Sequence, residues 1–103
     1  MRKAKIYNNG IAAGEFYELE ANKSYEFIYY ENYAGEPVSL TMPVGHKKFK
    51  FDSFPPFFEG LLPEGILLEN LLRTAKIDRN DLFSQLMYVG NDLVGSVTVK
   101  EIE

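Results

Sequence analysis

The first half of the chain alternates between apolar and polar residues, which is the pattern of half-buried β-strands. Residues 24–30 show it most clearly, because they place Tyr25, Phe27 and Tyr29 on one face. Asn8-Asn9-Gly10 separates the first two alternating stretches, and its Asn-Gly pair is a strong signal for a tight hairpin turn. The strands that this pattern predicts lie at residues 3–7, 11–19, 24–30 and 38–42, and residues 48–52 are expected to form a short strand or an extended arm.

The second half changes to the spacing of amphipathic helices. One helix is predicted from Glu64 to about Ala75, with Pro63 in its first turn and a single apolar face. Asp78 is expected to cap the next helix, which ends at Gly90. The apolar face of the first helix comprises Leu67, Leu68, Leu71, Leu72 and Ala75.

Val97 and Val99 alternate with polar residues in a last strand. A run of strands followed by helices is typical of an α+β fold. We therefore expect a single domain over residues 1–103. It should contain an antiparallel sheet of about five to six short strands, with two to three helices packed on one side of it.

Residues 54–69 combine three prolines, two glycines, three phenylalanines and four leucines with only three charges. So much apolar surface argues against a free linker. The prolines and glycines also exclude one continuous helix. The segment therefore predicts a short helical turn, a sharp corner and a second helix, all of them buried against another surface.

Composition excludes several classes of protein. The 103 residues contain no cysteine and one histidine, His46, so neither a thiolate metal site nor a disulfide scaffold is expected, and we predict no cofactor. The formal net charge of −4 argues against direct nucleic-acid binding. No apolar run is long enough to span a bilayer and no signal peptide is recognisable, so we expect a cytoplasmic protein.

Two carboxylates, Glu59 and Glu64, flank the corner in residues 60–63 and could form an acid/base pair. A structural role is the stronger interpretation, because Glu64 lies where a helix dipole favours negative charge. The chain has no glycine-rich nucleotide loop and no kinase-type catalytic loop. We therefore do not expect it to be an enzyme.

Ile66 does not fit the apolar face of its predicted helix. At 3.6 residues per turn it points almost opposite to the leucine face. An isoleucine in that position is either covered by a neighbouring loop or available to a partner protein. Tyr88 also lies off the apolar face of its helix.

Several motifs together resemble a known family. The first is the Asn-Gly hairpin, and four more segments follow it: Pro-Val-Ser-Leu-Thr-Met-Pro at 37–43, Phe-Phe-Glu-Gly-Leu-Leu-Pro-Glu-Gly at 57–65, Asp-Leu-Phe-Ser-Gln-Leu at 81–86 and Val-Gly-Asn-Asp-Leu-Val-Gly at 89–95. In this order they resemble the N-terminal subdomain of HipA-type serine/threonine kinases, the toxin kinases of bacterial toxin–antitoxin systems.

In a HipA-type kinase, several hundred residues with the nucleotide site and catalytic aspartates follow this region. This sequence ends at Glu103, so we expect it to lack them. It is similar to HipS-like proteins, the small members of three-component HipBST systems. That resemblance implies an antitoxin that binds and neutralises a HipT-like kinase, beside a HipB-like protein that binds DNA.

The resemblance also implies a binding surface around the corner and the following helix. Glu64 and Ile66 are expected to face outward, on a scaffold that includes Leu61. HipS-like chains can carry tryptophan after Pro-Glu-Gly, where this chain has Ile66. This difference argues against a mechanism that needs a large ring in the kinase's active site and leaves an aliphatic plug open. The predicted partner-binding residues are Phe54, Phe57, Phe58, Leu62, Glu64 and Ile66.

Two other functions stay open at this point. The chain could be a detached regulatory lobe that a HipA-like kinase needs for activity or for docking its DNA-binding partner. It could also be an independent enzyme that uses Glu59 and Glu64.

Overall fold

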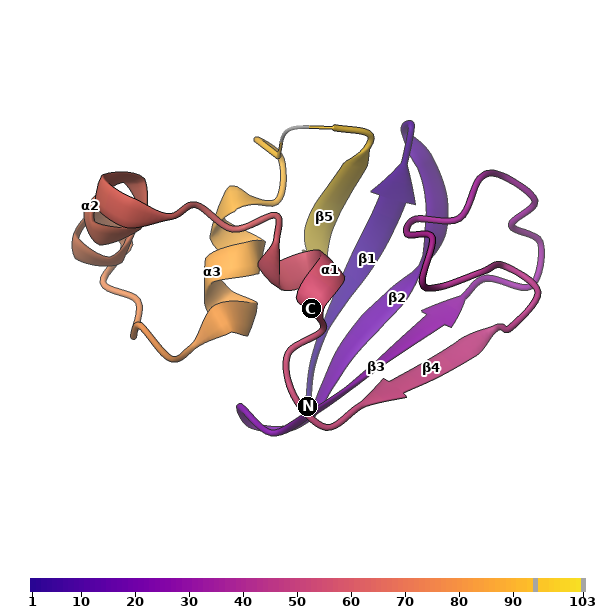
Figure 1. Cartoon of the computed structure of the whole chain (residues 1–103), viewed down its shortest axis with the longest axis horizontal. Coiled ribbons are helices and arrows are strands. Elements are labelled where there is room, and N and C mark those ends of the chain that lie inside the picture. Colours follow the sequence, from indigo (N-terminus) through magenta and orange to yellow (C-terminus); the bar gives the residue numbers. More distant parts are fainter. Residues whose placement is uncertain (94, 103) are drawn as a thin grey trace.

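The computed structural model describes residues 1–93 and 95–102. Within them, five strands form one antiparallel sheet in the order β4-β3-β2-β1-β5 (Figure 1). The predicted α+β class is confirmed. The strands are β1 (Arg2–Asn8), β2 (Ile11–Glu20), β3 (Ser24–Tyr29), β4 (Lys48–Phe51) and β5 (Val97–Ile102).

The Asn-Gly signal is confirmed by the turn between β1 and β2. Asn9 and Gly10 both have positive φ, at 54° and 79°, as a two-residue hairpin turn of this kind requires. The paired strands place alternate residues on opposite faces, with Ala4 and Ile6 toward the core. The register shifts between Ile6 and Tyr7, so that Ala13 and Gly14 of β2 are both buried. The turn alone therefore does not fix which residues of β2 beyond this point face inward.

The strand predicted at residues 38–42 is wrong. These residues form a tight turn in which the Met42 N–H donates to the Ser39 carbonyl (3.0 Å). The alternation arises because Val38 and Met42 point into the core while Leu40, at the tip of the turn, points into solvent. The Val38 N–H donates to the Tyr29 hydroxyl and not to a neighbouring strand.

The helices are α1 (Pro56–Glu59), α2 (Gly65–Ala75) and α3 (Leu82–Val89). The predicted helix starts need two corrections. Pro63 precedes α2, because Glu64 is the N-cap. Asp78 does not cap α3: its carboxylate accepts from the Asn80 N–H in the preceding turn, and Asp81 caps the helix by accepting from the Ser84 N–H.

Gly90 ends α3, as the sequence predicts, but for a different physical reason. Its φ of −52° is accessible to any residue, so left-handed backbone geometry is not what favours glycine here. A Cβ at this position would lie 2.1 Å from the Val99 carbonyl oxygen. The glycine thus allows the end of α3 to approach β5 closely.

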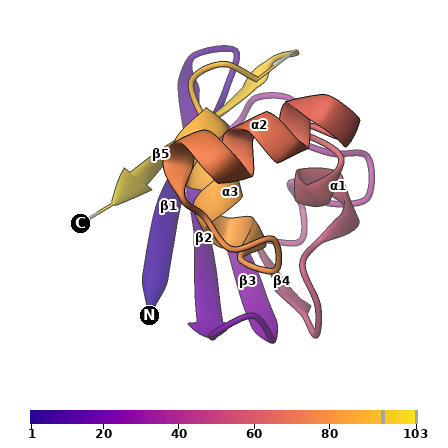
Figure 2. The ribbon, with the colours of Figure 1, turned by 90° about the vertical axis from the view of Figure 1, so that its left-hand side faces the viewer.

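The core lies between the sheet and helices α1 and α3. Phe16 of β2 stacks on Phe58 of α1, with ring centroids 4.5 Å apart, and on Phe83 of α3 at 5.5 Å. Figure 2 shows α3 between α2 and the sheet. No residue of α2 belongs to the core cluster of the described chain, so α2 lies outside the main body.

Candidate protein-binding surface

Helix α2 exposes large apolar side chains. Ile66 is 76% exposed and Leu67 is 66% exposed. Of the predicted leucine face only Leu71 is buried, so the prediction was wrong for Leu67. The reason is that α2 packs on α3 at one end of the molecule (Figure 1), and so narrow a support cannot cover a wide apolar stripe.

Local backbone geometry sets the direction of α2. Gly65, its first residue, has a φ of +60°, which glycine adopts without steric cost. At the other end of α2 the backbone of Lys76 has the left-handed conformation, and its N–H donates to the Leu72 carbonyl. Glu69 and Arg79 form a 2.7 Å ion pair, but both are about half exposed, so we expect it to contribute little stability.

A largely apolar groove of about 400 Å³ adjoins Leu67. One wall is the corner between α1 and α2, and the other is the end of α3 with the loop that follows it. Leucine, proline and valine supply most of the lining, so the groove suits an apolar side chain of a partner. Its lining residues are Gly60, Leu61, Leu62, Pro63, Leu67, Val89, Asp92 and Leu93.

The structure separates the six predicted contact residues into two layers. Phe54, Phe58 and Leu62 are buried in the core, at 9% exposure or less, and Phe57 is half-buried. Glu64 and Ile66 are exposed beside the corner. The phenylalanines and Leu62 therefore have the position of a scaffold, while the binding role of Glu64 and Ile66 stays a prediction.

Sequence reasoning missed Leu67 and the groove. The helical periodicity assigned Leu67 to the buried face, and no pattern in the sequence showed that α2 would stand away from the sheet. Val89 and Leu93 line the groove from a segment more than twenty residues away.

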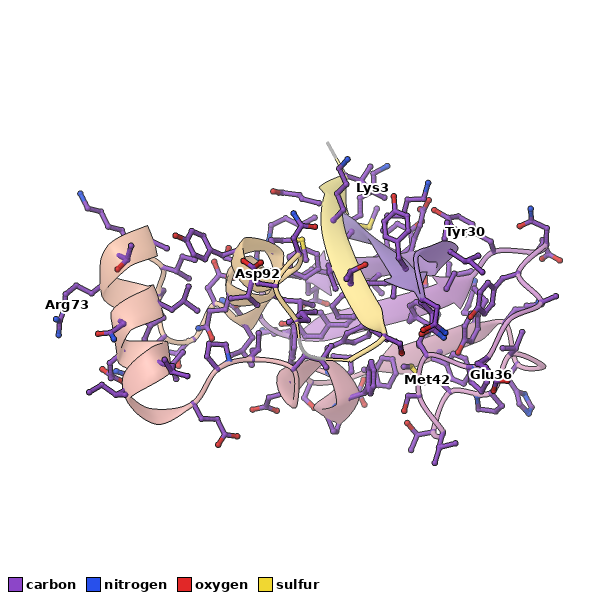
Figure 3. All side chains as sticks on the ribbon, turned by 90° about the horizontal axis from the view of Figure 1, so that it is seen from above. Lys3, Tyr30, Glu36, Met42, Arg73 and Asp92 are labelled. Atoms are coloured by element: carbon purple, nitrogen blue, oxygen red, sulfur yellow. The ribbon has the colours of Figure 1, made fainter. Side chains whose placement is uncertain are left out.

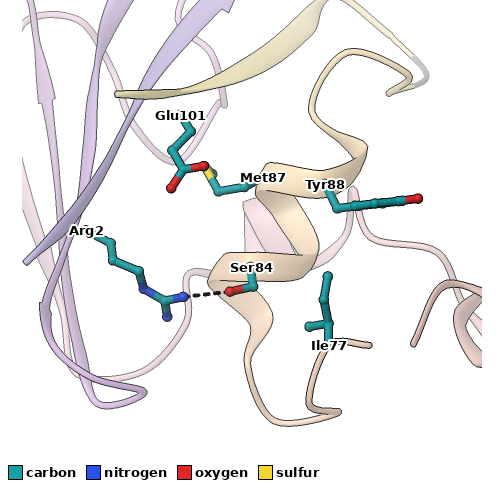
Figure 4. A pocket seen from close by; sticks show the side chains of 6 residues that line it. All are labelled: Arg2, Ile77, Ser84, Met87, Tyr88 and Glu101. Carbon is teal, nitrogen blue, oxygen red and sulfur yellow. Dashed lines mark hydrogen bonds between the residues drawn. The ribbon is translucent and has the colours of Figure 1, made fainter. Parts of the chain in front are cut away.

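A polar cluster ties α3 to the sheet, and Figure 4 shows one of its bonds, from Arg2 of β1 to Ser84 of α3. Arg2 donates to Glu18 (2.7 Å), Asp81 (2.8 Å) and Ser84 (2.6 Å). Burial raises the pKa of the Glu18 carboxyl, but hydrogen bonds from Arg2 and the Asn22 N–H lower it further, so it lies below its usual range. The pKa of Asp81 is lowered in the same way, by Arg2 and Ser84 against the effect of burial.

This cluster borders a cavity of about 230 Å³ that Ile77, Met87, Tyr88 and Glu101 also line. The charged groups of the cluster, Arg2, Glu18 and Asp81, are bonded to each other, as in a structural clamp between β1, β2 and α3. Glu59 and Glu64, the carboxylates considered for catalysis, are both exposed. The described part of the chain contains no cluster suited to a metal ion, and none of its helices has the length and apolar character to cross a membrane.

These features define a class of molecule: a small α+β domain with an exposed apolar helix beside an apolar groove. The sequence model of the HipA N-terminal domain matches residues 4–100. The chain therefore belongs to the HipA N-terminal domain family, and the resemblance predicted from its motifs is confirmed.

A solved structure, described as the N-terminal domain of HipA toxin, superposes with a TM-score of 0.80 and 29% sequence identity. That match covers 100% of this chain and 94% of the other. An uncharacterized protein of Haemophilus influenzae is 34% identical over 90 residues, which cover 85% of both proteins.

The putative kinase Y4dM of Sinorhizobium fredii is 40% identical over 70 residues. The match covers 64% of this chain but only 17% of the putative kinase. The shared family is that of the N-terminal domain and not that of the catalytic kinase domain.

Proposed function

We propose that this protein is an antitoxin that binds a HipT-like serine/threonine kinase through α2 and the adjoining corner. Binding holds the kinase inactive, and the chain performs no reaction of its own. The observation that carries the proposal is the exposure of two adjacent apolar residues, Ile66 (76%) and Leu67 (66%), on a helix outside the core. Water contact makes this arrangement unfavourable for an isolated domain, and a partner's surface would relieve it.

The relatives support this proposal in two ways. The similar protein of Haemophilus influenzae is of comparable length, so the fold also occurs as a small protein. The putative kinase Y4dM contains a related segment within a much longer chain. We infer that a domain that is part of a longer putative kinase in one relative acts on a separate kinase in this protein.

Ile66 and Glu64 are the proposed outward contacts. Ile66 lies in the first turn of α2 and precedes Leu67, which lines the groove. Two mechanisms fit this position: the first turn of α2 enters the nucleotide or substrate cleft, or the corner fixes an inactive arrangement of the kinase lobes. The complex would form in the cytoplasm, and a HipB-like DNA-binding protein would join it in a larger assembly.

The first test replaces Ile66 by aspartate. We expect Ile66→Asp to keep the melting temperature, because the side chain lies outside the core, and to weaken binding to the kinase at least tenfold. Calorimetric titration measures the affinity. Ile11→Asp is the matched control, since Ile11 is also exposed (61%) but lies at the β1–β2 hairpin. If Ile66→Asp and Ile11→Asp bind the kinase with equal affinity, Ile66 is not part of the interface.

The second test separates an antitoxin from an activating lobe. The activating lobe is the alternative that Y4dM favours, because there a related segment is part of the putative kinase itself. Autophosphorylation of the kinase is measured with and without the added protein. An antitoxin lowers the rate, whereas a required lobe raises it. A Glu59→Gln/Glu64→Gln variant that retains full inhibition would exclude catalysis by these carboxylates.

A further inference from the structure

The loop between β3 and β4 presents one leucine to solvent. Leu40 is 96% exposed, more than any other large apolar residue in the described chain. It occupies the second position of the tight turn closed by the Met42 N–H and the Ser39 carbonyl. Turn positions of this kind favour polar residues, glycine or proline, so local structure does not explain a leucine there.

Tyr29 holds both sides of this turn from within the core. Its hydroxyl accepts from the Val38 N–H (3.0 Å) and donates to the Met42 carbonyl (2.5 Å). Tyr29 is 2% exposed, and its pKa is raised by burial. One buried hydroxyl therefore bridges the residues on either side of the tip.

A second set of bonds holds the start of the loop. The side-chain amide of Asn8 donates to the Glu36 carbonyl (3.0 Å) and to the Tyr33 hydroxyl (3.2 Å). The Tyr33 hydroxyl donates to the same Glu36 carbonyl, and the Tyr33 ring stacks on Tyr29. Pro37 and Pro43 restrict the backbone at both ends of the tip. The loop is thus ordered before any partner arrives.

A single exposed leucine is common and by itself needs no explanation. A leucine fixed at the tip of a loop with buried supports is different. Because the loop is already ordered, burying Leu40 in a partner would cost little conformational entropy. An apolar anchor on a rigid support is the form that binding hot spots take.

We propose that Leu40 is a second anchor for the kinase and inserts into a small apolar pocket on it. This inference rests on the proposed function. Figure 3 places Glu36 and Met42 at the opposite end of the molecule from Arg73 of α2, and the longest dimension of the domain is 39 Å. The kinase would therefore contact the domain along its length.

The kinase is the occupant that the relatives favour. This chain matches only 17% of the putative kinase Y4dM, so a related segment lies there within a much larger protein that can cover both ends of the domain. Two contacts on one domain also act together, since forming the first makes the second intramolecular. Either contact alone would bind more weakly.

The experiment compares Leu40→Ser with Leu19→Ser in calorimetric titrations against a HipA-family kinase that lacks its own N-terminal domain. Serine is common in turns, so the loop should keep its shape. Leu19 is a partly exposed leucine (42%) near the β2–β3 turn. We expect Leu40→Ser to weaken binding at least tenfold, about 1.4 kcal/mol, while Leu19→Ser and Leu40→Met stay within threefold of the unmodified protein.

Three other outcomes are possible, and each would contradict the second anchor alone or both proposals. Equal affinities of Leu40→Ser and Leu19→Ser, with normal binding by the unmodified protein, would overturn the second anchor and leave the proposed function in place. A clear loss of melting temperature in Leu40→Ser would show that Leu40 supports the fold, which also overturns it. No binding by the unmodified protein would end both proposals together.

Discussion

The main body of the domain and helix α2 use apolar residues in opposite ways. In the body, Phe16, Phe58 and Phe83 are completely buried, and Phe58 and Phe83 both stack on Phe16 between the sheet and the helices. In α2, Ile66 and Leu67 are mostly exposed and only Leu71 is buried. The comparison shows that apolar content alone does not reveal whether a segment stabilises its own fold or is available to a partner.

The two regions should also differ in local stability. The body combines a five-stranded sheet with a continuous aromatic core, so its opening approaches global unfolding. Helix α2 packs on α3 and contributes nothing to that core. Regions with few buried apolar contacts open at lower free energy than the rest of a protein, and binding surfaces are often of this kind.

The largest expected effect is that of Phe58→Ala. Phe58 is fully buried and stacks on Phe16 at 4.5 Å, so its removal leaves a cavity beneath α1. We expect the free energy of unfolding to fall by about 3–5 kcal/mol, measured by urea denaturation. Phe57→Ala is the matched control on the same helix and should cost clearly less, because Phe57 is only partly buried. Equal losses would show that the aromatic core does not end at Phe58.

A smaller effect is expected for Arg2→Met, which leaves Glu18 buried without its cation. Losing one partner of a fully buried pair costs about 3–5 kcal/mol. Arg2 is 35% exposed and water screens its charge, so we expect about 2 kcal/mol at neutral pH.

The pH dependence of Arg2→Met tests the cause of that loss. In the unmodified protein the pKa values of Glu18 and Asp81 lie below their ordinary values of 4.5 and 3.8. Their stabilisation is therefore present above about pH 4.5 and is lost as the pH falls below it. Without Arg2, burial raises the pKa of Glu18 instead, so acid no longer destabilises through this group. The difference in unfolding free energy should shrink from pH 7 to pH 3, and a constant difference would contradict the clamp.

The same comparison explains what could be predicted from the sequence. The Asn-Gly turn, the alternation in β1 to β3 and the corner around Pro63 depend on neighbouring residues, and these local rules gave the right elements. Whether Leu67 is buried depends on which surface lies opposite α2, and the periodicity of one helix carries no information about that surface. Residues 38–42 alternate like a strand because a turn can also send its first and last residues inward, and the deciding bond comes from Tyr29, nine residues earlier.

Two acidic residues close in sequence caused the error about the cap of α3. Asp78 and Asp81 both satisfy the chemistry of a helix cap, and the choice depends on Arg2, which binds Asp81 from the first strand. For the candidate site, the sequence identified Ile66 as lying off the core face, and the structure shows it to be exposed. It did not identify the groove, because Val89 and Leu93 approach the corner only through the packing of α3.

The smallest expected effect on global stability is that of Leu67→Ala. The side chain is 66% exposed and both leucine and alanine favour helix, so the free energy of unfolding should change by less than about 0.5 kcal/mol.

Amide hydrogen exchange provides the sharper measurement of the difference between α2 and the body. In the unmodified protein, the amides of α2 should exchange through local opening and the central amides of β1 and β2 only through global unfolding. Adding the proposed kinase partner should slow exchange in α2 first, because the proposed docking would cover that helix, and Leu67→Ala should reduce this protection while the strands stay unchanged. If the amides of α2 and of the sheet exchange with the same free energy in the free protein, α2 belongs to the body and the division between the two regions fails.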